Sequence, residues 1–142
     1  MKILAIDTSQ TMMTACYYDG AHNLLETAEG QKNHAALLLP AIDRLLKTAA
    51  VTIRGIEAFC LVTGPGSFTG LRVGLSTLKG LGFGRRVPYI AVNSHELAAY
   101  YETKNAAEFY RVLAQKISQN QFTEDSEVRL HYEDIQTKRF PY

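Results

Sequence analysis

The glycine spacing of Leu61–Gly84 constrains the fold of this chain more than any other feature. The stretch reads LVTGPGSFTGLRVGLSTLKGLGFG and holds seven of the ten glycines. Its first residues predict a strand, and a helix is expected to begin near Ser67. Gly66, Gly70 and Gly74 recur every four residues, so a helix places them on one face. Each glycine costs about 1 kcal/mol inside a helix, and close packing against another backbone, most simply another helix, can offset that cost.

The common phosphate-binding frames are absent from this loop. A Walker A loop needs a second glycine five positions after the first, followed by lysine and a hydroxyl residue, but Thr69 stands five positions after Gly64. The dinucleotide frame GxGxxG, begun at Gly64 and Gly66, also meets Thr69 where it needs its third glycine. A looser anion site at the helix start and simple crowding in the core remain alternatives to helix packing.

The order of predicted elements indicates an α/β fold. Residues 2–7 predict a buried strand, and Asp19-Gly20 predicts a hairpin turn between two further strands. Strands first, followed by alternating helices and strands, predict a mixed βββαβαβ sheet with flanking helices. The later elements are a helix over 33–50, a strand over 56–64, the glycine helix, a strand over 87–93 and a helix that starts with Ser94 as its N-cap.

The last forty or so residues differ in character from the rest. We expect one domain over 1–101 and a smaller C-terminal segment over 102–142. The segment predicts a helix, a polar turn, a short strand and a loose tail, at 105–117, 118–127, 128–135 and 136–142.

The helix over 33–50 has an apolar arc wider than one sheet contact requires. Its polar side chains gather on one side of the helical wheel, together with Pro40, which is expected to kink the helix or to mark its first turns. The helix is either buried on most sides, or packed on its own sheet by one flank and on a partner by the other.

Composition and charge exclude several classes of protein. The net charge of +1 is too balanced for a free-standing nucleic-acid binder. No apolar run approaches the length of a membrane span, and the N-terminus lacks the features of a signal peptide. We therefore expect a cytoplasmic protein without membrane contact, in which Cys16 and Cys60 are reduced core thiols.

Catalytic and metal-binding motifs are also absent from the sequence. The four histidines, His22, His34, His95 and His131, show no metal-ligand spacing, and Ser67 does not lie in a GxSxG nucleophile elbow. We expect no catalytic residue, no metal site and no nucleotide site in this chain.

Four stretches resemble the TsaB (YeaZ) family of tRNA threonylcarbamoyladenosine (t6A) biosynthesis. They are MKILAIDTS, NHAALLLPAIDRLL, GPGSFTGLRVGLSTLKGLGFG and VPYIAVNSHELAAY, in that order along the chain. The resemblance covers residues 1–101 and implies an RNase H-like fold of the actin/Hsp70 ATPase superfamily. It implies one complete half of that fold, followed by a reduced C-terminal half or a replacement for it.

The resemblance implies a non-catalytic scaffold or activator subunit of the complex that forms t6A at position 37 of tRNAs reading ANN codons. It implies a TsaD-type catalytic partner, a TsaE-type ATPase, tRNA bound through the complex and a possible homodimer. ATP and metal are expected on the partner subunits, with none bound by this chain alone. The alternatives are a small ATP-binding enzyme of the superfamily and a self-associating remnant.

The resemblance also implies that partners dock on the helices over 33–49 and 67–81. The residues expected to form the interface are Leu38, Ile42, Leu45, Gly66, Gly70, Arg72, Val73, Gly74 and Thr77. Two roles remain open for Arg72, an ion pair across an interface and a buried structural ion pair. Superfamily ATPases place a glycine soon after the first strand's aspartate, whereas Thr8, Ser9 and Gln10 follow Asp7 here. Asp7 is therefore expected to bond nearby backbone rather than to catalyse.

Overall fold

The computed structural model describes residues 1–29 and 33–132 and contains one five-stranded sheet. The strands are β1 (Ile3–Asp7), β2 (Met12–Tyr18), β3 (Asn23–Glu29), β4 (Ala58–Gly64) and β5 (Tyr89–Asn93). Their order in the sheet is β3-β2-β1-β4-β5. The first three strands pair antiparallel, and β4 and β5 run parallel to β1. The predicted mixed sheet is confirmed.

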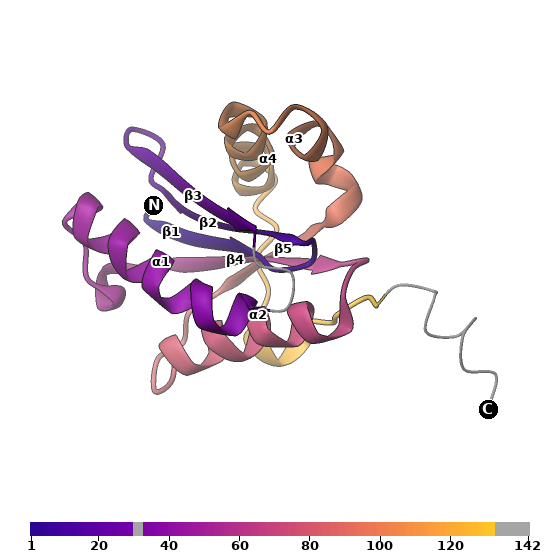
Figure 1. Cartoon of the computed structure of the whole chain (residues 1–142). Helices are drawn as coiled ribbons and strands as arrows, with labels where there is room; N and C mark the ends of the chain where they lie inside the picture. The colour runs from indigo at the N-terminus through magenta and orange to yellow at the C-terminus, as the bar shows by residue number, and fades with distance from the viewer. Residues whose placement is uncertain (30–32, 133–142) are drawn as a thin grey trace.

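Helices cover both faces of the sheet (Figure 1). One face carries α1 (His34–Ala49) and α2 (Phe68–Leu81), and the other carries α3 (Ala98–Thr103) and α4 (Ala106–Ser118). Short 3₁₀ turns lie at Ile53–Gly55, Ser94–Leu97 and Asp125–Glu127.

The alternation of side chains along β1 divides the interior into two cores. Leu4 and Ile6 pack into the core beneath α1 and α2, whereas Ile3 and Ala5 pack into the core beneath α3 and α4. Successive residues of a strand point to opposite faces, so a sheet covered on both sides needs a continuous apolar run. All five residues of β1 are accordingly buried.

Local signals placed most of the element boundaries. The carboxylate of Asp19 accepts hydrogen bonds from the backbone N–H groups of Ala21 and His22, at 2.8 Å and 2.6 Å, in the predicted turn between β2 and β3. The helix α1 continues through Pro40 to Ala49. The turn after β5 begins one residue earlier than expected, because Asn93 rather than Ser94 is its cap and forms a capping box with Glu96.

The C-terminal segment returns to the sheet as an extended strap, defined here as residues 121–132. It forms no regular strand, so the strand predicted from residue 128 is wrong over 128–132. Instead it makes isolated bridges from Thr123 to Tyr89 and from Tyr132 to Gly66, and Val128 is buried in the core beneath α1 and α2. The rest of that predicted strand and the predicted tail lie outside the described residues.

Candidate partner interface

The helices α1 and α2 lie side by side on one face of the sheet (Figure 1). Two large apolar side chains on these helices are exposed to solvent. Leu39 on α1 is 51% exposed, and Phe68 at the start of α2 is 43% exposed. Contiguous apolar patches mark protein interaction surfaces, whereas apolar residues exposed singly are common. We call the outer surface of the two helices that includes Leu39, Phe68, Arg72, Val73 and Thr77 the docking face.

Three expected interface residues on α1 face the wrong way for a partner. Leu38, Ile42 and Leu45 are buried in the core between α1 and the sheet, with at most 3% of each exposed. Their place in a partner interface is therefore corrected. The apolar arc of α1 is so wide that a helical wheel does not show which part of the arc faces the sheet. In the structure Leu39 is exposed and Leu38 is buried.

The glycine face of α2 packs closely, but not against another helix. A Cβ atom at Gly70 would lie 2.1 Å from the carbonyl oxygen of Thr8, and one at Gly66 would lie 2.5 Å from the carbonyl oxygen of Ser9. A Cβ atom at Gly74 would lie 2.5 Å from Oγ1 of Thr8. The expectation that these glycines meet a partner is corrected, because all three are buried against the turn that follows β1 of the same chain.

The first turn of α2 is fixed by local and distant hydrogen bonds. The helix begins close to Ser67 as predicted, and Ser67 is its cap, with its Oγ accepting a 3.1 Å hydrogen bond from the backbone N–H of Gly70. The hydroxyl of Ser94, from the turn after β5, donates to the carbonyl oxygen of Pro65 at 2.8 Å. The docking face therefore starts from a rigid turn.

Arg72 is exposed and lies over an aromatic ring. Its guanidinium carbon is 5.3 Å from the centre of the Phe68 ring, and that ring is 4.6 Å from the ring of Tyr132 in the strap. Within the described residues Arg72 has no carboxylate within 4 Å, so the buried structural ion pair considered for it is not present. Val73 and Thr77 are half-buried on the same helix.

Asp7 is sealed inside the fold at the carboxyl end of β1. It has no exposed surface, and its Oδ1 accepts hydrogen bonds from the backbone N–H and the hydroxyl of Ser9, at 2.9 Å and 2.6 Å. The hydroxyl of Tyr101 on α3 donates to Oδ2 at 2.5 Å. Burial raises the pKa of Asp7, although these hydrogen bonds and nearby His34 act to lower it.

The predicted bonding of Asp7 to nearby backbone is confirmed, whereas its contact with Tyr101 was not predicted. That residue lies 94 positions away along the chain, and no local pattern links it to β1. Only the packing of α3 on the sheet brings the two side chains together. The arrangement buries the carboxylate completely, whereas Tyr101 itself is half-buried.

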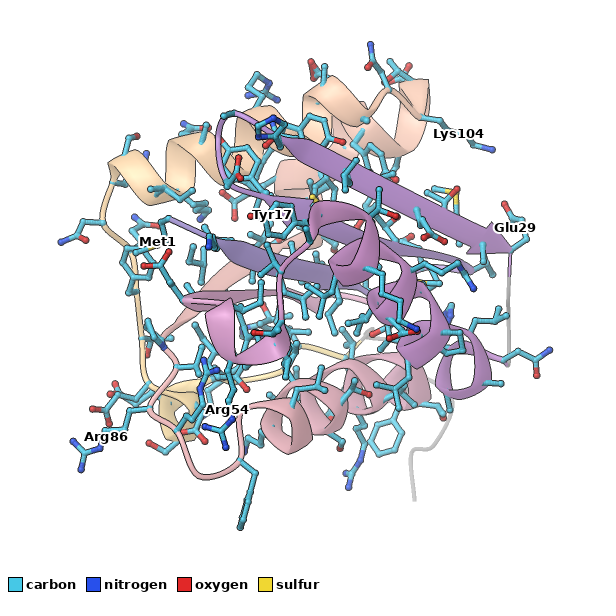
Figure 2. All side chains as sticks on the ribbon, turned by 90° about the vertical axis from the view of Figure 1, so that its left-hand side faces the viewer. Met1, Tyr17, Glu29, Arg54, Arg86 and Lys104 are labelled. Atoms are coloured by element: carbon cyan, nitrogen blue, oxygen red, sulfur yellow. The ribbon has the colours of Figure 1, made fainter. Side chains whose placement is uncertain are left out.

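A pocket of about 590 Å³ lies at the other end of β4, away from Asp7. Arg86 lies at the same end of the molecule as Arg54 (Figure 2). The pocket is lined by charged residues of both signs, namely Lys79, Arg85, Arg86, Glu124, Asp125 and Glu127. Arg85 donates hydrogen bonds to the carbonyl oxygens of Ile53 and Ile56. Such a wall is not the uniformly basic surface that nucleic-acid phosphates require.

The part of the chain that the structure describes holds neither a metal-binding cluster nor a membrane-spanning helix. Residues 1–29 and 33–132 contain no group of three or more metal-ligating side chains placed to hold an ion. Over the same ranges, every helix is too short or too polar to cross a lipid bilayer.

Comparison with known proteins gives consistent results. A sequence model of the TsaD family, described as tRNA N6-adenosine threonylcarbamoyltransferase, matches residues 26–114. The chain is 34% identical over 95 residues to the tRNA threonylcarbamoyladenosine biosynthesis protein TsaB of Haemophilus influenzae, covering 66% of this chain and 40% of that protein. It is 35% identical to the protein of the same name from Escherichia coli over 96 residues, which make up 66% of this chain and 41% of that one.

A solved structure shares the fold. The structure of YeaZ from Pseudomonas aeruginosa superposes with a TM-score of 0.67 and 30% sequence identity. The match covers 72% of this chain and 49% of that protein. The chain thus spans about half the length of the Pseudomonas aeruginosa protein. It spans 40% and 41% of the two TsaB proteins. The likeness supports the RNase H-like α/β fold expected from the resemblance.

Proposed function

Because the matching sequence model covers more than half of it, this chain belongs to the TsaD family and is a relative of TsaB proteins, and we propose that it is a non-catalytic subunit of t6A biosynthesis. In this proposal the chain scaffolds or activates a TsaD-type catalytic subunit. A TsaE-type ATPase completes the complex, tRNA binds through the complex, and ATP and metal reside on the other subunits. A homodimer is the competing assembly.

The observation that carries the proposal is the exposed apolar surface of α1 and α2. Leu39 and Phe68 remain accessible, whereas Leu38, Ile42 and Leu78 of the same helices are buried against the sheet. Burying a fully exposed leucine or phenylalanine side chain contributes about 1.5–3 kcal/mol, and about half of each of these two side chains is still exposed. Two such anchors on adjacent rigid helices suit a partner that also presents helices, because ridges of side chains then interlock.

The environment of Asp7 supports a non-catalytic role. A carboxylate that acts as a general base or binds a metal needs lone pairs directed at a ligand. Here one oxygen of Asp7 accepts two hydrogen bonds from Ser9 and the other accepts one from Tyr101, and the side chain is fully buried. Access to this carboxylate would require α3 to move away from the sheet.

The test is a binding and activity measurement with purified components. The 142-residue chain is mixed with the TsaD-type protein of the same genome, and the complex is measured by size-exclusion chromatography with light scattering. Formation of t6A on tRNA is then followed with the TsaE-type ATPase, ATP and a preformed activated threonylcarbamoyl donor present. We expect a complex and t6A formation that depends on the chain, whereas the chain alone forms no t6A.

A matched pair of variants locates the contact. Leu39→Asp places a charge on the docking face, whereas Ala114→Asp places the same charge on an exposed position of α4, on the other side of the sheet. We expect the first to lose the complex and the second to keep it. Equal binding by both variants would remove the docking face from the proposal. ATP binding by the isolated chain, or dimers without any TsaD complex, would favour the enzyme or the self-association alternative.

A further inference from the structure

We propose that Arg72 is the point on the docking face that recognises a carboxylate of the TsaD-type partner, and that Tyr132 of the strap positions it. This inference rests on the proposed function and adds the chemistry of the contact. Phe68 contacts the other two side chains concerned, the ring of Tyr132 and the guanidinium of Arg72. We call the three side chains the aromatic–arginine stack.

These contacts place the charge of Arg72 against an aromatic ring on an exposed surface. The rings of Phe68 and Tyr132 lie 4.6 Å apart with an angle of 44° between their planes, and the guanidinium carbon of Arg72 lies 5.3 Å from the Phe68 centre. A guanidinium over an aromatic face is attracted by the ring electrons. The contact with Phe68 restricts the Arg72 side chain before any partner binds. A free arginine side chain carries about 2 kcal/mol of rotamer entropy, which binding would otherwise cost. Arg72 is thereby preorganised.

The hydrogen-bonding capacity of Arg72 is unused within the described residues. The four ion pairs there involve other basic residues, namely Arg44, Lys47, Arg111 and Lys116. Over the same part of the chain no hydrogen bond uses an Arg72 donor, and the residue is exposed. A planar fork of five N–H donors matches a carboxylate through two parallel hydrogen bonds. Charge complementarity therefore indicates an aspartate or glutamate on the partner surface.

Tyr132 reaches the stack from a distant part of the chain. The family model ends its match at residue 114, so the strap lies beyond the matched region. The strap is fixed just before Tyr132 by a 2.7 Å hydrogen bond from the backbone N–H of His131 to the carbonyl oxygen of Thr63. Gly64 permits this approach, since a Cβ there would lie 2.0 Å from the carbonyl oxygen of His131. Tyr132 is a positioning residue, because it acts on Arg72 through Phe68.

The experiment measures the dissociation constant of the complex with the purified TsaD-type protein at low and high salt. Arg72→Lys keeps the charge but loses the fork, so we expect binding about tenfold weaker than wild type. Tyr132→Ala should weaken binding about threefold, and Tyr132→Phe, which keeps the ring, should restore it. Arg111→Lys is the matched control, because Arg111 is an exposed arginine on the opposite face of the sheet.

The outcomes separate this inference from the proposed function. If wild-type protein binds and Arg72→Lys binds equally well, the carboxylate contact is overturned while the scaffold role stands. If Tyr132→Ala and Tyr132→Phe bind alike, the positioning role of the strap is overturned. If wild-type protein does not bind the TsaD-type protein, both the inference and the proposed function are overturned. Circular dichroism of each variant establishes that the fold is retained.

Discussion

Thr8 and Gly70 approach so closely that no side chain fits between them. Oγ1 of Thr8 donates a 2.6 Å hydrogen bond to the carbonyl oxygen of Gly70, and a Cβ at position 70 would lie 2.1 Å from the carbonyl oxygen of Thr8. The contact joins the turn after β1 to the first turn of α2. It explains the glycine spacing of α2 without any partner helix.

Gly70→Ala should therefore destabilise the protein strongly. The atom that blocks the new methyl group is a backbone oxygen, which cannot rotate away, so we expect a loss of about 3 kcal/mol in the free energy of unfolding. Gly80→Ala is the control within the same helix, because nothing lies within 4 Å of its new Cβ. It should stabilise the protein by about 0.5 kcal/mol. Urea unfolding measures both, and equal effects would contradict the steric explanation.

Leu38 and Leu39 should differ sharply although they are neighbours. Leu38 is fully buried and Leu39 is 51% exposed. Leu38→Ala should cost about 2–5 kcal/mol of unfolding free energy, because it leaves a cavity in the core. Leu39→Ala should change stability by less than about 0.5 kcal/mol and should weaken the TsaD-type complex. Chemical unfolding and binding titrations of the two variants check this, and a large stability loss at Leu39 would refute the assigned orientation of α1.

Asp7 should make the stability of the protein fall as pH rises. Its pKa is raised in the fold, chiefly by burial, so the folded protein holds this proton more tightly than the unfolded chain. The contribution of Asp7 is thus full below about pH 3.9, the ordinary aspartate value, and is lost as pH rises through the raised pKa. The stability of wild type relative to Asp7→Asn should fall in that direction, as measured by urea unfolding at several pH values.

Asp19 supplies a control of opposite sign for this experiment. Hydrogen bonding, first from the backbone of His22, lowers its pKa. Its contribution is present above the ordinary aspartate pKa and is lost as pH falls. The stability of wild type relative to Asp19→Asn should therefore rise with pH. Parallel slopes for the two variants would show that the burial of Asp7 does not govern its titration.

The two cysteines should be unreactive in the folded protein. Cys16 and Cys60 are buried free thiols, and burial raises the pKa of both. Thiol reagents attack the exposed thiolate, so both access and ionisation are suppressed. We expect Ellman's reagent to label neither cysteine in native buffer and both in denaturant. Rapid labelling of one thiol in native buffer would mean that its side of the sheet opens easily.

Local sequence signals predicted most of the sheet and the helices. The apolar run of β1, the Asp19-Gly20 turn and the helix start near Ser67 each depend on a few neighbouring residues, so composition and spacing are enough to reveal them. The same signals predicted a strand from residue 128, which is wrong over 128–132. There the alternation of Val128 and Leu130 reflects packing against the core rather than pairing in the sheet.

The amino-acid sequence alone determined the order of strands and helices, the tight turn into α2 and the need for something to pack closely on its glycines. Tertiary structure decided what that neighbour is, which leucine of α1 is exposed, and that Tyr101 seals Asp7. Thr8 and Gly70 are 62 positions apart, and Asp7 and Tyr101 are 94 apart. Such contacts depend on how whole elements are placed on the sheet, and periodicity within one element carries no information about that placement.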